Sequence, residues 1–439
     1  MMRDVRKYGA SGDGATLDTA AIQRAIDDGG VIFFPPGRYL TGTLYLRDNT
    51  HLYIGMGAEL FASPDLNDYN KADFAPQNGS SKAECTSGGH LIVAHECTNV
   101  MISGGGRITG NSSAWLTQPD PACPKLLKTE LRPAQMLWFC ECTNVRIMNL
   151  DLGDAPYWHC FIWGCEDVMI RNIRIRGNRR VQNSDGIDVD CSKNVIISDC
   201  NIDTSDDCIT MRAVNSRLKT PRPCENVLVQ NCILQSAYAN TIRIGVGGGE
   251  ICNVVFDNLM LLGYLRGIKM NCSWNAASRG VNIHDIEFRN IRNFTRCPVT
   301  MRGNNCHLPA PPNSAMHHIR FRNISGTLEQ SCFIEGENDL IKDISFENID
   351  FVCHGKGPAQ DLSADGLWGH ISTDAVFELH DVKELLFRNV KIRYADGTSG
   401  WTTECRAVNA ENLHFENCDF PLYNDKIKKF NPKKRRHEK

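Results

Sequence analysis

The segment Asn194-Val195-Ile196-Ile197 is one copy of a short pattern that recurs along most of the chain. Each copy begins with a polar residue, continues with the apolar alternation of a short strand, and leads through a polar turn into a second strand. Further copies begin at Asn99, Asn144, Asp167, Asn226, Asn253, Asp285, His318, Asp343, Glu384 and Asn412. In the central part of the chain the copies follow one another at a variable period of roughly 23–33 residues, without a helical pattern between them, which favours stacked β-coils.

This period predicts an all-β fold, a parallel β-helix in which every coil buries its inward side chains against its neighbours. Many copies continue with an asparagine, which we expect at the bend between two strands because its side chain tolerates left-handed backbone. These asparagines are Asn172, Asn201, Asn231, Asn258, Asn290, Asn323, Asn348, Asn389 and Asn417. The leucine pattern of a leucine-rich repeat is absent from the sequence, and the repeats hold too few strands for propeller blades.

A different pattern precedes the repeats. Residues 18–26 predict a helix with one apolar face and with Asp18 as its candidate N-cap. Residues 31–34 predict a buried strand. We therefore expect residues 1–45 to form an N-terminal cap unit of a single β-helix domain that spans residues 1–423.

Composition excludes several classes of protein. The chain has 439 residues, of which 42% are hydrophobic and 23% charged, as in soluble globular proteins. A net charge of −3 argues against a nucleic-acid partner bound through bulk charge. No apolar run reaches the length of about 18 residues that a membrane span needs. The first residues lack the apolar segment of a secretory signal, so we expect a cytoplasmic protein, with secretion left open if a signal preceded this numbering.

The 20 cysteines are dispersed and form no pair of CxxC motifs. We expect them to be small buried core residues of a reduced protein, and we predict neither a metal site nor a cofactor. Residues 424–439 are basic and predict a disordered, solvated tail. Polar insertions at residues 111–135, about 304–317 and about 355–372 interrupt the repeats, and such insertions often wall a groove.

Two successive repeats carry acidic turns. The first reads Asn183-Ser184-Asp185-Gly186, and the second reads Asp206-Asp207-Cys208 one repeat later. If the repeats are stacked coils, their carboxylates converge on one patch, as acid/base chemistry on a sugar linkage requires. Three crowded carboxylates cannot all ionise together, so we expect one to keep its proton near neutral pH.

These turns, together with residues 57–69 and 102–110, resemble those of glycoside hydrolase family 28, the polygalacturonase family, and the resemblance covers nearly the whole chain. The resemblance implies a right-handed parallel β-helix and glycoside hydrolysis with inversion. Asp206 resembles the general acid, whereas Asp185 and Asp207 resemble the pair that activates the attacking water. Inversion needs room for this water, so we expect a separation of about 6.5–9.5 Å between acid and base.

The following repeats depart from the family pattern. Asn240 stands where the family has a histidine, and an asparagine does not titrate near pH 7. In the family, cations on these repeats bind the carboxylate of galacturonate. Here Arg243, Arg266 and Lys269 are the candidates for that role, with Arg212 as a further one. We therefore count Asn240 and these four cations as candidate substrate-binding residues.

The sequence thus favours a glycosidase that acts on a pectin-like or other uronate-containing glycan. Two alternatives stay open. A β-helix lyase or a transglycosylase is one, and a lyase would use calcium to hold the uronate carboxylate. A carbohydrate-binding solenoid without catalytic activity is the other. A carbohydrate is the only partner predicted. The identity of the sugar, the linkage, the endo or exo mode and the oligomeric state are left open.

Overall fold

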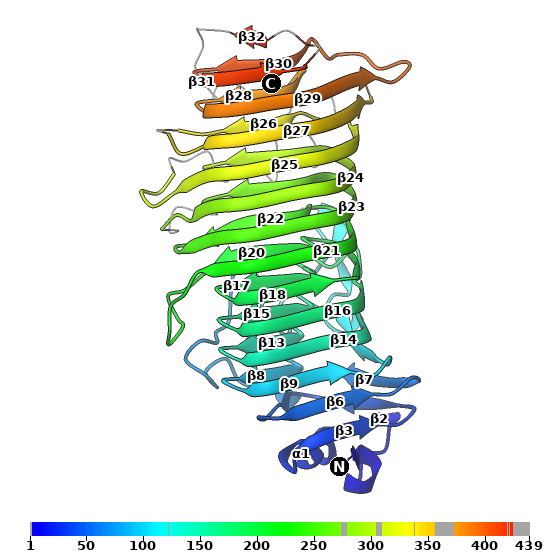
Figure 1. The fold of residues 1–439 in the computed structure, drawn as a ribbon. Helices are drawn as coiled ribbons and strands as arrows, with labels where there is room; N and C mark the ends of the chain where they lie inside the picture. The colour runs from blue at the N-terminus through cyan, green and yellow to red at the C-terminus, as the bar shows by residue number, and fades with distance from the viewer. Residues whose placement is uncertain are drawn as a thin grey trace. The chain divides into compact units, whose positions relative to one another are not determined.

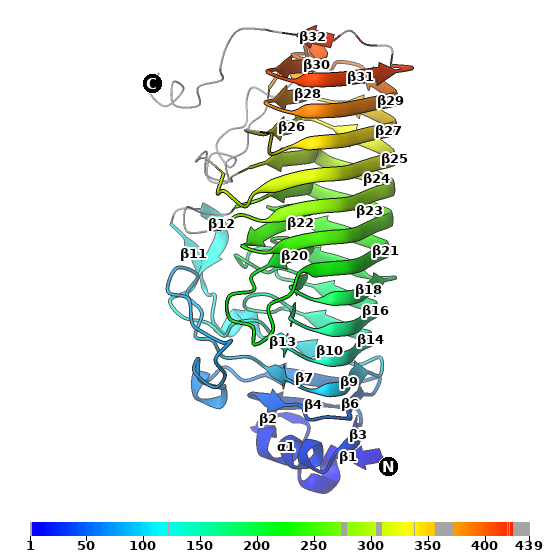
Figure 2. The same ribbon diagram turned by 60° about the vertical axis from the view of Figure 1, so that its left-hand side comes forward.

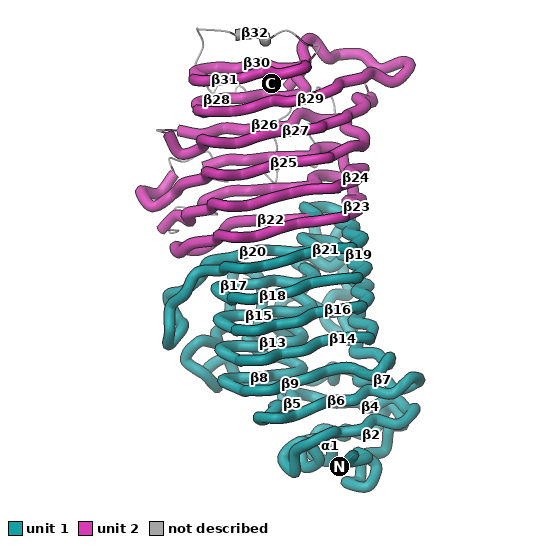
Figure 3. Tube along the Cα trace, in the orientation of Figure 1, with its two compact units in different colours: residues 1–241 teal, residues 242–439 magenta. Residues whose placement is uncertain are grey.

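The computed structural model describes residues 2–121, 123–273, 279–303, 310–337, 339–355, 373–418, 420 and 422–424. Contacts divide the chain into two compact parts, unit 1 (residues 1–241) and unit 2 (residues 242–439), shown in Figure 3. The predicted single domain over residues 1–423 therefore stays a prediction. The predicted tail lies outside the described residues except for residue 424, as does most of the insertion at residues 355–372.

Unit 1 combines the N-terminal cap with a series of coils (Figure 1). Its elements are β1 (Met2–Asp4), η1 (Val5–Tyr8), β2 (Asp13–Leu17), α1 (Thr19–Asp27), β3 (Gly30–Phe34), β4 (Gly37–Thr41), β5 (Leu44–Tyr45), β6 (Thr50–Ile54), β7 (Ala58–Ala62), η2 (Leu66–Asp68), β8 (Ile92–His95), β9 (Thr98–Ser103), β10 (Arg107–Thr109), η3 (Ser112–Ala114), β11 (Gln118–Asp120), β12 (Cys123–Lys128), β13 (Leu137–Cys140), β14 (Thr143–Gly153), β15 (Cys160–Trp163), β16 (Glu166–Arg176), β17 (Ile187–Asp190), β18 (Lys193–Ser198), β19 (Asn201–Thr204), β20 (Ile209–Ala213) and β21 (Cys224–Ser236).

Unit 2 consists of further coils, and β22 (Asn240–Gly247) contains the boundary between the two units. The other elements of unit 2 are β23 (Glu250–Asn271), β24 (Asn282–Arg302), β25 (Ala315–Leu328), β26 (Cys332–Glu335), β27 (Lys342–Cys353), β28 (Ala375–His380), β29 (Lys383–Tyr394), β30 (Thr403–Val408), β31 (Glu411–Glu416) and β32 (Leu422–Asn424).

Equivalent residues of successive repeats pair with each other, which confirms the predicted parallel β-helix. In unit 1, Val145 pairs with Val168 and Val168 with Val195, along the parallel strands β14, β16 and β18. In unit 2, Ile286 of β24 pairs with Ile319 of β25. These inward residues are buried, so each coil covers the apolar face of the next.

The polar residue at the start of each repeat lies at a corner of the coil. Asn194, for example, has a left-handed backbone with φ of 55°. The second set of asparagines behaves as predicted, since Asn323 has a φ of 54° and donates from Nδ2 to Asn290 one coil earlier at 3.1 Å. Asn201 is the exception to this prediction. Asp199 occupies the left-handed corner with a φ of 58°, and Asn201 lies inside β19.

A column of stacked aromatic rings runs through the coils of unit 2. The ring centroids of Phe288 and Phe321 lie 5.0 Å apart, and those of Phe321 and Phe346 lie 4.7 Å apart. The described cysteines are free thiols, and most are buried as predicted. Among the described residues, no helix is long and apolar enough to cross a membrane.

The cap contains the predicted helix, α1, whose apolar residues are buried against the first coils. The expected N-capping role of Asp18 is wrong, because its side chain makes no hydrogen bond to the helix. Its carboxylate instead accepts from the backbone of Ser11 at 2.6 Å and of Gly12 at 2.9 Å. Asp18 thus holds the glycine-rich turn, whose exposed amides offer closer donors than the first turn of the helix.

Candidate active site

The two acidic turns lie on adjacent coils of unit 1, each just before a buried strand. Strand β17 follows the turn with Asp185, strand β20 follows the turn with Asp206 and Asp207, and the two strands pair in parallel. The amide of Gly186 donates to the carbonyl of Asp207 at 2.9 Å, so the turns themselves are stacked. A Cβ atom on Gly186 would overlap the carbonyl oxygen of Cys208, which is why this turn needs glycine.

This stacking brings the three predicted catalytic carboxylates together. One oxygen each of Asp185, Asp206 and Asp207 lies within 4.8 Å of the other two. The expected separation of about 6.5–9.5 Å between acid and base is therefore not met by these oxygens. The reason is the fold, because neighbouring strands lie about 4.7–4.9 Å apart and place equivalent side chains at that spacing.

Burial and mutual repulsion decide the protonation of this cluster. Asp185 is 5% exposed and Asp207 is 3% exposed, whereas Asp206 is half-buried. Burial raises the pKa of Asp185 well above its ordinary value, and the charges of Asp206, Asp188 and Asp207 raise it further. This direction agrees with the expectation that the cluster keeps a proton near neutral pH, and the proton belongs to a coupled set rather than to one residue alone.

Asn240, which stands where the family has a histidine, contacts the cluster directly. Its side-chain Nδ2 donates to Oδ1 of Asp207 at 2.5 Å, and its backbone amide donates to the same oxygen at 3.1 Å. The side chain is buried, and its own Oδ1 has no hydrogen-bond partner in the described part of the chain. Asn240 therefore supplies Asp207 with hydrogen-bond donors although it cannot exchange a proton near pH 7.

The predicted substrate-binding residue Arg212 has two carboxylate neighbours. Its Nη1 lies 3.7 Å from Asp188, and its Nε lies 3.4 Å from Asp190. Its guanidinium also covers the ring of Trp158 at 4.6 Å. Asp188 is fully buried, and burial raises its pKa despite the opposing charge of Arg212. Arg212 thus offsets the negative charge of the strands beneath the acidic turns.

Two residues near the cluster were missed by the sequence reasoning. His159 is fully buried one coil before Asp185, and its Nδ1 lies 2.8 Å from the carbonyl oxygen of Asp185. Burial lowers the pKa of His159 to about 4, so the ring is neutral at pH 7 and Nδ1 carries the donated hydrogen. Its position one repeat before Asp185 was the available signal. Arg132 is also buried and donates to the backbone of Gln182 at 2.6 Å and to the side chain of Asn183 at 3.2 Å.

Arg132 belongs to the insertion at residues 111–135. This insertion contains the antiparallel pair β11 and β12, and the backbone of Leu127 donates to Arg180 at 2.7 Å. The insertion therefore packs against the segment that leads into the first acidic turn, in agreement with the expectation that insertions line a functional groove.

The other three predicted substrate-binding cations lie in unit 2. Arg243 is 7% exposed and donates from Nη2 to Asn271 at 3.3 Å. Arg266 and Lys269 are buried in β23, where Lys269 pairs in register with Thr300 of β24. Their burial sets these cations apart from solvated surface residues.

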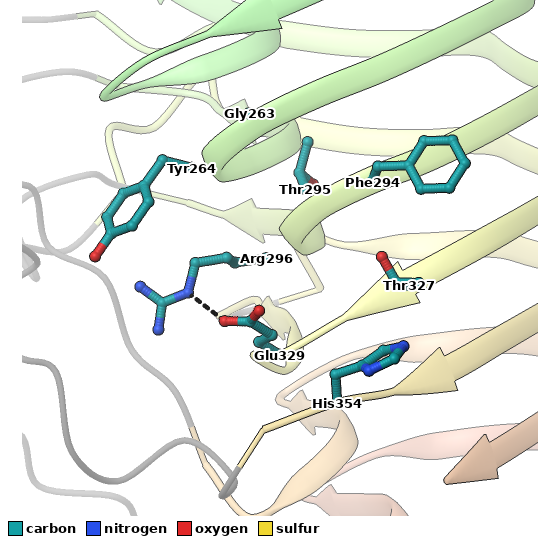
Figure 4. Close-up of a pocket in the computed structure, with 8 residues that line it drawn as sticks. All are labelled: Gly263, Tyr264, Phe294, Thr295, Arg296, Thr327, Glu329 and His354. Carbon is teal, nitrogen blue, oxygen red and sulfur yellow. Dashed lines mark hydrogen bonds and ion pairs between the residues drawn. The ribbon is translucent and has the colours of Figure 1, made fainter. Parts of the chain in front are cut away.

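Unit 2 also contains a pocket of about 600 Å³ (Figure 4). Tyr264 and Phe294 at this pocket are 40% and 42% exposed. The guanidinium of Arg296 lies 5.0 Å over the ring of Tyr264, and its Nε donates to Glu329 at 2.9 Å. The lining residues are Gly263, Tyr264, Phe294, Thr295, Arg296, Thr327, Glu329 and His354.

Stacked parallel coils and a buried carboxylate cluster on their turns define a β-helical protein with the groups that acid/base chemistry on a glycosidic bond requires. The model of glycosyl hydrolases family 28 matches residues 66–364, and the chain belongs to this family. A second family model, for rhamnogalacturonase A/epimerase, pectate lyase-like proteins, matches residues 2–104.

Individual relatives are distant. The chain is 26% identical over 277 residues to polygalacturonase QRT2 of Arabidopsis thaliana, and the match covers 60% of this chain and 60% of the relative. It is 22% identical over 325 residues to rhamnogalacturonase A of Aspergillus niger, which covers 65% of this chain and 64% of that one. The chain thus spans about three fifths of the length of these curated relatives.

Among solved structures, the exopolygalacturonase of Thermotoga maritima has a TM-score of 0.62 and 23% sequence identity. The match covers 80% of this chain and 87% of that chain. This likeness establishes the fold, a right-handed parallel β-helix, as the sequence predicted.

Proposed function

We propose that the protein is a glycosidase that hydrolyses a pectin-like, uronate-containing polysaccharide or oligosaccharide. The observation that carries this proposal is the convergence of Asp185, Asp206 and Asp207 within 4.8 Å on stacked turns. Membership of family 28 supports the same reaction class, and the names of the polygalacturonase and rhamnogalacturonase relatives support a pectic substrate.

In the proposed mechanism, Asp206 protonates the leaving glycosidic oxygen. It is the most exposed of the three carboxylates, and its Oδ1 accepts from the backbone amide of Asp207 at 2.9 Å, which holds its orientation. Asp185 and Asp207 lie deeper and together activate the water. Asn240 keeps Asp207 in place as a hydrogen-bond acceptor. After attack, the proton taken from water stays on the deeper pair, and the product carries the proton from Asp206.

We propose inversion at the anomeric carbon, since the family resemblance implies it. The oxygens within 4.8 Å are closer than the usual spacing of inverting enzymes, so the stereochemistry needs a direct measurement. Proton NMR during the first turnovers shows whether the initial product is the inverted or the retained anomer. Retention would replace the activated water by a covalent glycosyl–enzyme intermediate.

The pocket of unit 2 supports a carbohydrate with acidic groups. Exposed aromatic rings such as Tyr264 and Phe294 offer apolar faces to the C–H face of a sugar ring. Arg296 offers a fixed cation for a carboxylate, because Glu329 and Tyr264 hold its side chain. We propose that uronate residues of the substrate contact this pocket.

The decisive experiment is to incubate the protein with homogalacturonan and rhamnogalacturonan oligosaccharides and to weigh the products. Hydrolysis adds one water per cleaved bond, whereas elimination leaves an unsaturated product that absorbs ultraviolet light. Full activity in excess chelator, without that absorbance, excludes the calcium-dependent lyase. Transfer products longer than the starting chain identify a transglycosylase.

A matched variant separates catalysis from binding. Asp206→Asn keeps the size of the side chain and removes its acid function. Loss of product formation with retained oligosaccharide binding supports the proposal. Unchanged turnover overturns the role of Asp206, and binding without turnover in the unmodified protein across the panel favours the carbohydrate-binding solenoid.

A further inference from the structure

The outer face of unit 2 carries a row of metal-binding side chains. Cys252 of β23 pairs in register with His284 of β24, and His284 pairs with His317 of β25. These three strands are neighbours in Figure 1. Glu250 precedes Cys252 by two residues, and side chains two apart on a strand point to the same face. Four potential ligand side chains therefore occupy adjacent positions on one face.

Three of these side chains are close enough to share one ion. A carboxylate oxygen of Glu250, Sγ of Cys252 and a ring nitrogen of His284 lie within 4.8 Å of one another. Nε2 of His284 is 2.7 Å from Oε1 of Glu250. Cys252 is 6% exposed, and the side chains of His284 and Glu250 are 17% and 45% exposed. The cluster is thus sheltered but reachable from solvent.

A further carboxylate orients the histidine. Nδ1 of His284 lies 2.6 Å from Oδ2 of Asp285. This arrangement is the one that metal-binding histidines usually have, in which one ring nitrogen donates to a carboxylate and the other faces the ion. The ring of His317 stacks on that of His284 at 4.9 Å with an interplanar angle of 3°, which fixes the ring plane.

The ordinary interpretation of the pair Glu250 and His284 is a surface ion pair. It accounts for the contact at Nε2, but it leaves the thiol and the second carboxylate at Nδ1 without a role. A divalent ion uses all four groups. The pair Nε2–Oε1 at 2.7 Å would open and the widest separation would close toward about 3.3–3.7 Å, the donor spacing of a tetrahedral zinc site with Zn–N of about 2.0 Å and Zn–S of about 2.3 Å.

We propose that Glu250, Cys252 and His284 form a binding site for a borderline divalent ion such as Zn²⁺, with Asp285 as the outer partner of His284. Sulfur and imidazole donors select zinc over calcium or magnesium, which prefer oxygen. The remaining coordination position is open to water. Binding releases the thiol proton and any proton shared between His284 and Glu250 to solvent, and it links two adjacent coils.

The test uses the full chain, stripped with chelator and titrated with Zn²⁺ and with Co²⁺ as a spectroscopic probe. We expect one tightly bound equivalent, the charge-transfer absorption of a cobalt–thiolate bond, and a rise in melting temperature when Zn²⁺ is added. Cys252→Ser and Glu250→Gln should each weaken binding at least tenfold, and Cys252→Ser should abolish the thiolate band. Circular dichroism checks that each variant is folded.

Matched controls separate this site from other ligands. Cys418→Ser removes a half-buried thiol outside the cluster, and Asp206→Asn removes an oxygen ligand of the acidic turns. Both should bind cobalt with the spectrum of the unmodified protein. Absence of tight binding in the unmodified protein, or equal binding in Cys252→Ser and Cys418→Ser, overturns the proposal. None of these readouts depends on glycosidase activity, so the proposed function and the metal site fail independently.

Discussion

Removal of the Asn240 side chain tests how this protein functions without the family histidine. Asn240→Ala deletes the Nδ2 donor that lies 2.5 Å from Oδ1 of Asp207. The backbone donor at 3.1 Å stays, because it belongs to the main chain. The variant therefore reports on one side-chain hydrogen bond to a buried carboxylate.

The expected size of the effect follows from this geometry. A hydrogen bond to a charged group contributes about 1.5–3 kcal/mol. Asn240 is 3% exposed, so water does not readily replace the lost donor. At about 1.4 kcal/mol for each factor of ten, kcat/KM should fall about 10-fold to 150-fold. Stability should change by less than about 1 kcal/mol, because the variant also removes the buried, unpartnered Oδ1.

The assay measures kcat/KM on the best pectic oligosaccharide together with the melting temperature. Asn323→Ala is the matched control, since Asn323 lies in the asparagine ladder of unit 2. It should leave kcat/KM unchanged. Asn240→His restores a donor and should recover part of the lost rate. Equal kcat/KM in Asn240→Ala and the unmodified protein would refute the role assigned to Asn240, as would an equal loss in Asn323→Ala.

Three further predictions concern the acidic turns and the core. Because burial raises the folded-state pKa of Asp185, its ionisation in the unfolded chain favours unfolding above about pH 4, so Asp185→Asn should raise the melting temperature at pH 7 and lose this advantage at pH 4. Asp206→Asn should lose about 10²–10⁴-fold in kcat on natural linkages but much less on an aryl glycoside with an activated leaving group, and an equal loss on both would show that Asp206 is not the acid. Gly186→Ala should lower both activity and stability, since the new methyl overlaps the carbonyl of Cys208, and unchanged activity would contradict the close stacking of the turns. Phe321→Ala should destabilise unit 2 by about 3–5 kcal/mol in urea unfolding with its ring stack broken, whereas a loss below about 1 kcal/mol would contradict its packing.

Prediction from sequence succeeded where structure is local and repeated. The copies at Asn144, Asp167 and Asn194 could be aligned by eye, and their strands pair in that same register. Prediction failed where neighbouring donors compete for one side chain. Asp18 precedes a helix, yet its carboxylate binds the glycine-rich turn, which folds back against it. Asn201 looked like a corner residue, but Asp199 takes the left-handed position two residues earlier.

The sequence by itself determined the coil period, the family and the placement of Asp185, Asp206 and Asp207 on successive turns, because each is a property of short segments repeated along the chain. Only the tertiary structure decided how near these carboxylates lie, since parallel strand spacing rather than catalytic need sets their separation. It also decided which side chains meet across coils. Insertions of variable length separate Cys252 from His284 in sequence, and the register of β23 and β24 alone makes them neighbours.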